Sequence, residues 1–293
     1  MKQIILLSGK GGTGKTTITA ALGMLAGKDA VMADCDVDAS NLHLLLRPKI
    51  RRETEFSGGR VPMFDTRACR QCGMCAAACV YDAIVMRNGQ YEVDEAACEG
   101  CAVCSHVCPD GYITMMPRVT GRWFVSRSRF HQHMVHARLG IGQENSGKLV
   151  TQVRNQATEI AAKERVPYVI VDGPPGVGCP AIASVSGASE VLLVTEATRA
   201  GQHDLARLIE LLEHFGLSGS CIINKADLDG GVSREIRRLC EDHHISVVAE
   251  LPWSDVFPES LREARTLIEM EDIELTAQIE KIWKHLSTNG NGS

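Results

Sequence analysis

Residues 8–17 read SGKGGTGKTT, and this stretch is the strongest indication of the fold. An apolar run at residues 2–8 precedes it and predicts a buried strand, whereas residues 17–25 predict a helix. Between them, residues 9–16 fit the pattern G-x-x-x-x-G-K-[ST] in the strand–loop–helix context that this pattern needs. Its glycines let backbone N–H groups approach phosphates, and the helix N-terminus adds partial positive charge. The stretch therefore predicts a loop that holds the phosphates of a nucleotide.

Individual residues of this loop have separate predicted roles. Lys15 is expected to reach the β- and γ-phosphates, and the hydroxyl of Thr16 is expected to hold Mg²⁺. The other predicted nucleotide-binding residues of the loop are Gly9, Lys10, Gly11, Gly12, Thr13, Gly14 and Thr17. A second match at residues 142–148 has Leu149 in place of the hydroxyl and lacks a preceding strand. We therefore interpret it as a turn that opens a helix near residues 149–161.

Strand and helix patterns alternate along much of the remaining chain. Strands are predicted at residues 31–38, 168–176, 190–195, 219–224 and 245–251, and helices at residues 202–215, 233–243 and 258–268. This alternation predicts an α/β fold with a mostly parallel sheet and right-handed crossovers. Ligands of such sheets bind at the carboxyl ends of the strands. Ser8, Asp36, Asp172 and Asn224 are all predicted to lie there.

Eight of the twelve cysteines form two copies of one pattern. The runs are Cys69-x-x-Cys72-x-x-Cys75-x-x-x-Cys79 and Cys98-x-x-Cys101-x-x-Cys104-x-x-x-Cys108, the second followed by Pro109. Bacterial ferredoxins with two 4Fe–4S clusters have this spacing, and the fourth cysteine of each run ligates the other cluster. The first cluster is then expected on Cys69, Cys72, Cys75 and Cys108, and the second on Cys98, Cys101, Cys104 and Cys79.

Two other uses of these cysteines fit less well. Zinc sites take four ligands, usually as CxxC pairs, and the runs carry too many cysteines too close together. A disulfide framework conflicts with a reducing compartment.

The residues between and after the cysteine runs predict short strands. Residues 81–94 predict a hairpin that turns at Asn88-Gly89, with residues 112–115 as its counterpart. We expect a small α+β ferredoxin domain at residues 60–117, inserted between two parts of the nucleotide domain at residues 1–59 and 118–286, and a disordered tail at residues 287–293.

The composition and charge of the chain limit the functions that it can have. The chain has 293 residues, of which 44% are hydrophobic and 23% charged, and its net charge is −5. A negative net charge argues against nucleic acid as a partner. The sequence shows no signal-peptide pattern and no apolar run of the roughly 18 residues that span a bilayer, so stable membrane insertion is not expected. These features predict a cytoplasmic protein.

Three stretches together resemble one superfamily. Lys10 directly follows the first glycine of the loop, residues 31–38 read VMADCDVD, and residues 168–176 read YVIVDGPPG. These features resemble the MinD/ParA/nitrogenase-iron-protein superfamily of P-loop ATPases, in particular members with an inserted ferredoxin domain. The resemblance implies that Lys10 reaches the nucleotide of a dimer partner and that Asp36 orients the attacking water. It also implies that Asp172 acts on Mg²⁺ through water and that residues 173–176 sense the γ-phosphate.

The sequence allows two interpretations of the nucleotide base. Residues 224–227 read Asn-Lys-Ala-Asp, and N-K-x-D is the guanine-reading motif of small GTPases. In the MinD-like superfamily an asparagine at this strand end contacts adenine instead, which assigns that contact to Asn224. Because the phosphate site resembles that superfamily, we favour ATP, and a GTP preference would contradict this assignment.

The hypothesis with most support is an ATPase that couples a nucleotide-driven conformational change to electron transfer through two 4Fe–4S clusters. The alternatives are an iron–sulfur carrier similar to Mrp-type ATPases and a redox-sensing positioning ATPase. The resemblance implies a homodimer or a heterodimer with a paralogue, and electron transfer implies an unidentified redox partner. The roles of Cys179 and of His131, His133 and His136 stay open. Cys179 has three possible roles, as a cluster ligand, as a redox thiol or as a packed side chain.

Overall fold

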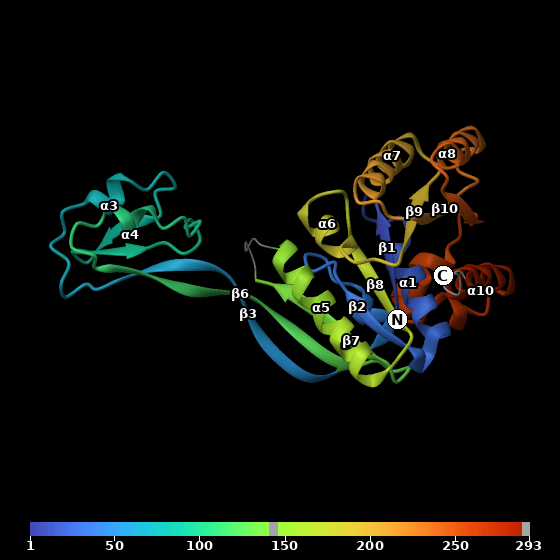
Figure 1. Cartoon of the computed structure of the whole chain (residues 1–293), viewed down its shortest axis with the longest axis horizontal. Coiled ribbons are helices and arrows are strands. Elements are labelled where there is room, and N and C mark those ends of the chain that lie inside the picture. Colours follow the sequence, from blue (N-terminus) through green and yellow to red (C-terminus); the bar gives the residue numbers. More distant parts are fainter. Residues whose placement is uncertain (141–145, 289–293) are drawn as a thin grey trace. The chain divides into compact units, whose positions relative to one another are not determined.

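The computed structural model describes residues 1–140 and 146–288, which divide into two compact units. Unit 1 contains residues 1–53, 123–138 and 146–288, and unit 2 contains residues 54–122 and 139–140. The predicted inserted domain, residues 60–117, falls within unit 2. The chain passes from unit 1 to unit 2 along strand β3 (Lys49–Phe64) and returns along β6 (Ile113–Arg127) (Figure 1).

Within the described residues, the main sheet has nine strands in the order β11-β10-β9-β1-β8-β2-β7-β6-β3. Besides β3 and β6, its strands are β1 (Lys2–Ser8), β2 (Ala30–Asp34), β7 (His133–Leu139), β8 (Tyr168–Pro175), β9 (Glu190–Glu196), β10 (Gly219–Asn224) and β11 (Ser246–Glu250). All neighbours from β11 to β7 are parallel. The connection from β6 to β7 is too short for a crossover, so these two strands are antiparallel. The predicted mostly parallel α/β sheet is confirmed.

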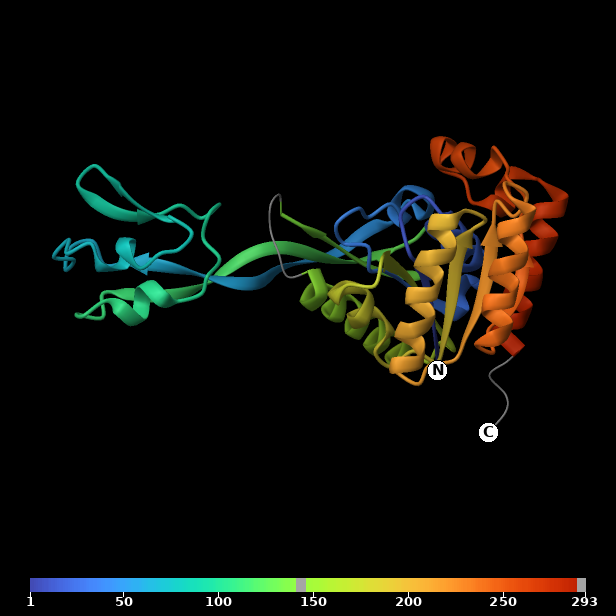
Figure 2. The same cartoon turned by 90° about the horizontal axis from the view of Figure 1, so that it is seen from above.

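Helices cover both faces of this sheet (Figure 2). They are α1 (Lys15–Ala26), α2 (Leu42–Leu46), α5 (Ser146–Glu164), α6 (Cys179–Val185), α7 (Arg199–His214), α8 (Gly230–Asp242), α9 (Val256–Glu263) and α10 (Ile273–Thr288), with short 3₁₀ turns η1 (Gly27–Asp29) and η2 (Leu267–Met270). Ile4 and Leu6 of β1 pack with α1, α2 and α10 in one core cluster. Ile5 and Leu7 are equally buried and point to the opposite face, because strand side chains alternate.

Several element ends differ from the sequence-based expectation. β2 ends at Asp34 rather than residue 38, because the buried Asp34 carboxylate turns the chain by accepting bonds from the Asp36 N–H (3.2 Å) and the Ser40 hydroxyl (2.6 Å). Helix α10 continues through Thr288, so the first two residues of the expected tail are helical, and residues 289–293 lie outside the described residues. Of the second phosphate-loop match, residues 142–145 also lie outside them, and the rest begins α5.

Unit 2 is small and contains two short helices and one hairpin. Besides the ends of β3 and β6 it has α3 (Met74–Ala77), β4 (Ile84–Arg87), β5 (Gln90–Val93) and α4 (Val103–Val107). Strands β4 and β5 are antiparallel, and the turn residues Asn88 and Gly89 both have positive φ (49° and 75°), which is typical of a two-residue hairpin turn. The predicted hairpin is therefore confirmed. The predicted counterpart at residues 112–115 is the start of the much longer β6.

Candidate functional site

The phosphate loop lies between β1 and α1, and its backbone requires glycine. Gly12 and Gly14 have φ values of 81° and 91°, in the left-handed region that other residues rarely adopt. A Cβ on Gly14 would lie 2.6 Å from Nδ2 of Asn224 and 2.9 Å from the ring of Phe257. Helix α1 begins at Lys15, directly after the loop, so its free N–H groups face the space where a phosphate would bind.

Asp172 of β8 joins this loop to the neighbouring strand. Its carboxylate is fully buried, and Oδ1 accepts a hydrogen bond from the Lys15 ammonium at 2.7 Å. The Thr16 hydroxyl donates to the other carboxylate oxygen at 2.7 Å, and the Thr19 hydroxyl donates at 3.0 Å. A buried carboxylate is costly unless it is paired and hydrogen-bonded, and here it is both. The structure thus brings together Lys15, Thr16 and Asp172, which the sequence analysis placed at one site.

Two further carboxylates lie at the end of β2 and just after it. Asp36 is half-buried, and burial raises the pKa of its carboxyl. Asp34 is fully buried, and its pKa is raised to about 7, first by burial and then by the charge of Asp172. Since Asp34 holds the Asp36 N–H and the Ser40 hydroxyl, it fixes the start of the loop on which Asp36 lies.

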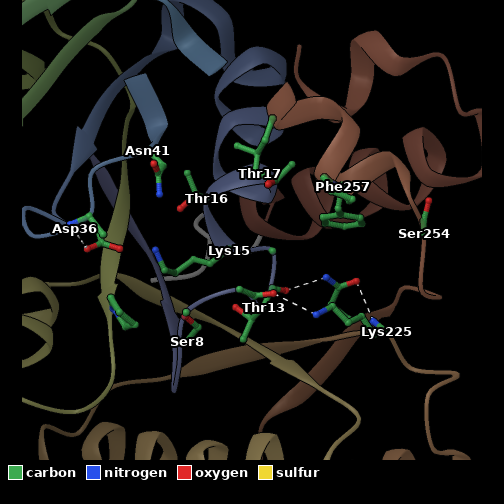
Figure 3. A pocket seen from close by; sticks show the side chains of 18 of the residues that line it. Ser8, Thr13, Lys15, Thr16, Thr17, Asp36, Asn41, Lys225, Ser254 and Phe257 are labelled. Atoms are coloured by element: carbon green, nitrogen blue, oxygen red, sulfur yellow. Dashed lines mark hydrogen bonds between the residues drawn. The ribbon is translucent and has the colours of Figure 1, made fainter. Parts of the chain in front are cut away.

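These residues surround a cavity of about 460 Å³, which is in the size range of small-molecule sites (Figure 3). Its lining residues are Ser8, Gly11, Gly12, Thr13, Gly14, Lys15, Thr16, Thr17, Asp36, Ala39, Asn41, Pro175, Asn224, Lys225, Trp253, Ser254, Phe257, Pro258 and Leu261. In Figure 3, Asp36 and Asn41 lie to one side of Lys15, and Lys225, Phe257 and Ser254 lie to the other. The cavity therefore has a carboxylate at one end and, at the other, the Lys225 ammonium, which is paired with Glu196, beside the apolar ring of Phe257.

Lys10 lies beside this cavity rather than among its lining residues. Its ammonium pairs with Glu196, the last residue of β9, and Glu196 also receives the Lys225 ammonium at 2.9 Å. Lys225 further donates to the Gly12 carbonyl at 3.2 Å. The sequence analysis missed Glu196 because it ended the predicted strand at Thr195. A carboxylate at the carboxyl end of a central strand was the available signal.

The N-K-x-D residues are held by other parts of the protein. The Asn224 side-chain amide donates to the Thr13 carbonyl at 2.8 Å, and its oxygen accepts from the Lys225 N–H at 2.9 Å. The Asp227 carboxylate accepts from the Trp253 N–H at 2.6 Å and does not line the cavity. An adenine contact by Asn224 stays a prediction.

Two hollows in unit 2 collect the eight patterned cysteines. Cys69, Cys72, Cys75 and Cys108 line the first, and Cys79, Cys98, Cys101 and Cys104 line the second. The spacing predicts the same two sets of four. All twelve cysteines, each within the described ranges, are free thiols. In residues 1–140 and 146–288, no group of three or more His, Cys, Asp and Glu side chains is arranged to hold a single metal ion.

The two cysteine runs share one backbone conformation. Gln71 and Gly100, each one residue before the second cysteine of its run, have φ values of 61° and 66°. Gly73 and Ala102, each one residue after it, have φ values of 77° and 67°. In both runs the residue before the second cysteine donates its N–H to the sulfur of the first, at 3.4 Å. The runs are thus structural repeats, with N–H groups directed at sulfur.

The remaining candidate residues are separate from these sites. Cys179 is exposed at the start of α6. His133 pairs with Glu164 at 2.7 Å, and His136 contacts the Ser126 hydroxyl at 2.9 Å and stacks on Phe124. The structure therefore gives these two histidines protein partners. No helix within the described ranges has the length and apolarity needed to cross a bilayer.

The sheet, the phosphate loop and the cavity define a P-loop nucleotide-binding protein of the α/β class. Residues 4–267 match the family described as CobQ/CobB/MinD/ParA nucleotide binding domain, and the chain belongs to that family.

Three known proteins illustrate the similarity. The chain is 32% identical over 229 residues to the uncharacterised protein MJ0578 of Methanocaldococcus jannaschii, covering 78% of this chain and 79% of that protein. It is 38% identical over 79 residues to an iron-sulfur protein of Rhodospirillum rubrum, covering 26% and 38% of the two chains. The fold resembles that of MinD from Pyrococcus horikoshii, solved with Mg-ADP, with a TM-score of 0.58, 17% identity and coverage of 99% and 97%.

Proposed function

We propose that the chain is a Mg-dependent ATPase that carries two 4Fe–4S clusters in unit 2 and couples nucleotide binding to electron transfer through them. The observation that carries this proposal is that two hollows in unit 2 separate the eight cysteines into the two sets of four that the spacing predicts. Their thiols are free, and thiolates are the ligands that iron–sulfur clusters take.

The donor sets fit cubane clusters better than single ions. Each set consists of four cysteines, and four thiolates are the ligands that a 4Fe–4S cube takes. The N–H groups of Gln71 and Gly100 point at cysteine sulfur, and such bonds tune the potential of a cluster. Bound clusters would supply one-electron chemistry, and each set of four cysteines would hold one of them.

The nucleotide half of the proposal rests on the phosphate cavity. Lys15 and the loop N–H groups would bind the phosphates, and Thr16 with Asp172 offers oxygen atoms of the kind that Mg²⁺ prefers. Asp36 would orient the attacking water from the acidic end of the cavity. Slow hydrolysis without a partner is expected, because the γ-phosphate contacts of such sites depend on closure of mobile loops.

Chain connectivity supports coupling between the two activities. β2 carries Asp34 at its end and lies between β8 and β7, and residue 34 is in register with His136 of β7. β6, which brings the chain back from unit 2, continues directly into β7. A change at the γ-phosphate side of the cavity would therefore act on the sheet edge through which the chain enters and leaves unit 2.

The proposal includes a dimer, formed by two copies or by this chain and a paralogue, and a separate redox protein that exchanges electrons with unit 2. In the dimer, Lys10 would leave Glu196 and approach the nucleotide of the partner. This step adds a cation near phosphate charge, which stabilises it.

An anaerobic redox titration with and without Mg-ATP tests the coupling, after iron and sulfide analysis has established the cluster content. By linkage, tenfold coupling shifts a one-electron potential by about 59 mV. We expect a shift of that order in the wild type and none in Lys15→Ala. A cluster-loaded protein that binds ATP without a shift contradicts the coupling. Transfer of the clusters to an apo-protein acceptor instead favours the carrier function.

A further inference from the structure

The N-K-x-D sequence at the end of β10 raises the question of which base the cavity accepts. Guanine presents two neighbouring donors, its ring N–H and its amino group, and in an N-K-x-D reader the carboxylate of the aspartate accepts from both of them. A buried donor left without an acceptor weakens binding. The position of Asp227 therefore decides whether the motif has this function.

Asp227 does not point into the cavity. Among the described residues that line the cavity, Asp36 is the one carboxylate, and it lies on the opposite side of Lys15 from Lys225 and Phe257 (Figure 3). The Asp227 carboxylate instead accepts the Trp253 N–H at 2.6 Å. Among the described lining residues, the end of the cavity near Lys225 and Phe257 thus has no carboxylate that could accept both guanine donors.

The other two residues of the motif brace the phosphate loop. Asn224 donates to the Thr13 carbonyl, and Lys225 donates to the Gly12 carbonyl and pairs with Glu196. The motif therefore connects the end of β10 to two segments, the phosphate loop through Asn224 and Lys225, and the segment after β11 through Asp227.

Trp253, Ser254 and Phe257 on that second segment line the cavity, and Ser254 and Phe257 lie on the same side of Lys15 as Lys225 (Figure 3). Trp253 is half exposed, so it offers an aromatic side chain that the fold does not bury. Stacking of a base on an aromatic side chain stabilises binding and does not depend on the base. Selectivity must then come from the polar groups, and the absence of a carboxylate at this end of the described cavity disfavours guanine.

We propose that Trp253 is the stacking surface for an adenine base and that Asp227 is a positioning residue that holds Trp253 in place. This inference rests on the proposed nucleotide-binding function and specifies the base of the nucleotide as adenine. It predicts that the motif braces the site and does not read guanine.

Equilibrium binding of ATP, GTP and XTP to the intact chain and its variants tests this. Xanthine replaces the guanine amino group by a carbonyl, so Asp→Asn in a guanine reader shifts preference towards XTP. We expect the wild type to bind ATP at least tenfold more tightly than GTP. Trp253→Ala should weaken ATP binding about tenfold, Trp253→Phe should restore most of it, and Asp227→Ala should weaken ATP several-fold.

Asp227→Asn keeps an acceptor for the Trp253 N–H, so it should change ATP affinity little and gain no XTP binding. Asp229→Asn is the matched control, because Asp229 caps α8 two residues further on and asparagine caps equally well. Tighter binding of GTP than ATP, or XTP binding gained by Asp227→Asn, overturns this inference. Absence of binding of any nucleotide by the folded wild type overturns the proposed nucleotide function itself.

Discussion

The phosphate site of unit 1 and the cysteine sites of unit 2 are built in opposite ways. The charged groups of the phosphate site already have partners within the chain, as in the contacts of Lys15 with Asp172 and of Lys10 with Glu196. The eight cysteines of unit 2 are free thiols gathered around two hollows. The phosphate site can therefore be shaped before its ligand binds, whereas the cysteine sites depend on what the thiols bind.

The cores of the two units differ in the same way. The core of unit 1 combines fully buried aliphatic side chains from β1, α1 and α10, among them Ile4, Ile18 and Ile279. The hydrophobic core cluster of unit 2 is formed by Cys75, Ile84, Cys104 and Ile113, and two of these residues are proposed ligands. Domains below about 70–80 residues rarely obtain enough stability from such a core without metals or crosslinks. Unit 2 is therefore expected to need its clusters to fold.

The largest expected effect follows from this dependence. Cys75→Ser and Cys104→Ser should each remove one cluster, and with it about half of the iron, because the cube loses a buried ligand. Limited proteolysis should then cut within residues 54–122, while unit 1 stays intact. Cys179→Ser is the matched control, because Cys179 is exposed and lines neither hollow. Full iron content in the two serine variants would show that the cysteines are not ligands.

The next effect separates charge pairing from catalysis in unit 1. Asp172→Asn leaves the buried Lys15 without its partner, so it should destabilise the nucleotide-free protein by about 3 kcal/mol and reduce ATP hydrolysis at least a hundredfold. Thermal unfolding and steady-state hydrolysis measure the two losses. Asp36→Asn is the control, because no ion pair within the described residues involves this half-buried side chain, and the variant should lose hydrolysis at nearly unchanged stability. Equal stability of both variants would mean that the Lys15–Asp172 pair adds nothing to the fold.

The smallest effect concerns the proton on Asp34, whose pKa is raised to about 7. Below that pH the folded chain holds a proton that the unfolded chain releases near pH 4, so the free energy of unfolding falls as the pH rises from about 4 to 7. Asp34→Asn should remove this part of the fall and gain stability relative to the wild type near pH 8. Denaturant unfolding of the wild type, Asp34→Asn and the exposed Asp38→Asn at several pH values checks this. Parallel pH profiles for all three would contradict the raised pKa.

Local patterns predicted much of the fold. The ends of β1 and β10 agree with the sequence analysis, because both strands are apolar runs bounded by turn residues. The hairpin turn at Asn88-Gly89 was predictable because its two left-handed residues favour Asn and Gly. The cysteine sets were predictable because ligand spacing is a property of the chain alone.

Long-range pairing was not predictable in the same way. Most of β3 is exposed, and its sequence KIRRETEFSGGRVPMF contains charges, two glycines and a proline, so it lacks the apolar pattern of a strand. Its strand conformation depends on β6, which is far away in the sequence. The Lys10–Glu196 pair and the Asp227–Trp253 contact were missed for the same reason, because only the folded sheet brings these residues together.

The repeated backbone of the two cysteine runs also has an evolutionary consequence. At each of the two left-handed positions one run has glycine and the other has a residue that pays a conformational cost, Gln71 opposite Gly100 and Ala102 opposite Gly73. Gly100 cannot be replaced by the glutamine of the other run, because a Cβ there would lie 2.4 Å from the Arg60 carbonyl. Copies of one ancestral half would thus have diverged under different neighbours, and a sequence restored to symmetry at this position would need glycine in both runs.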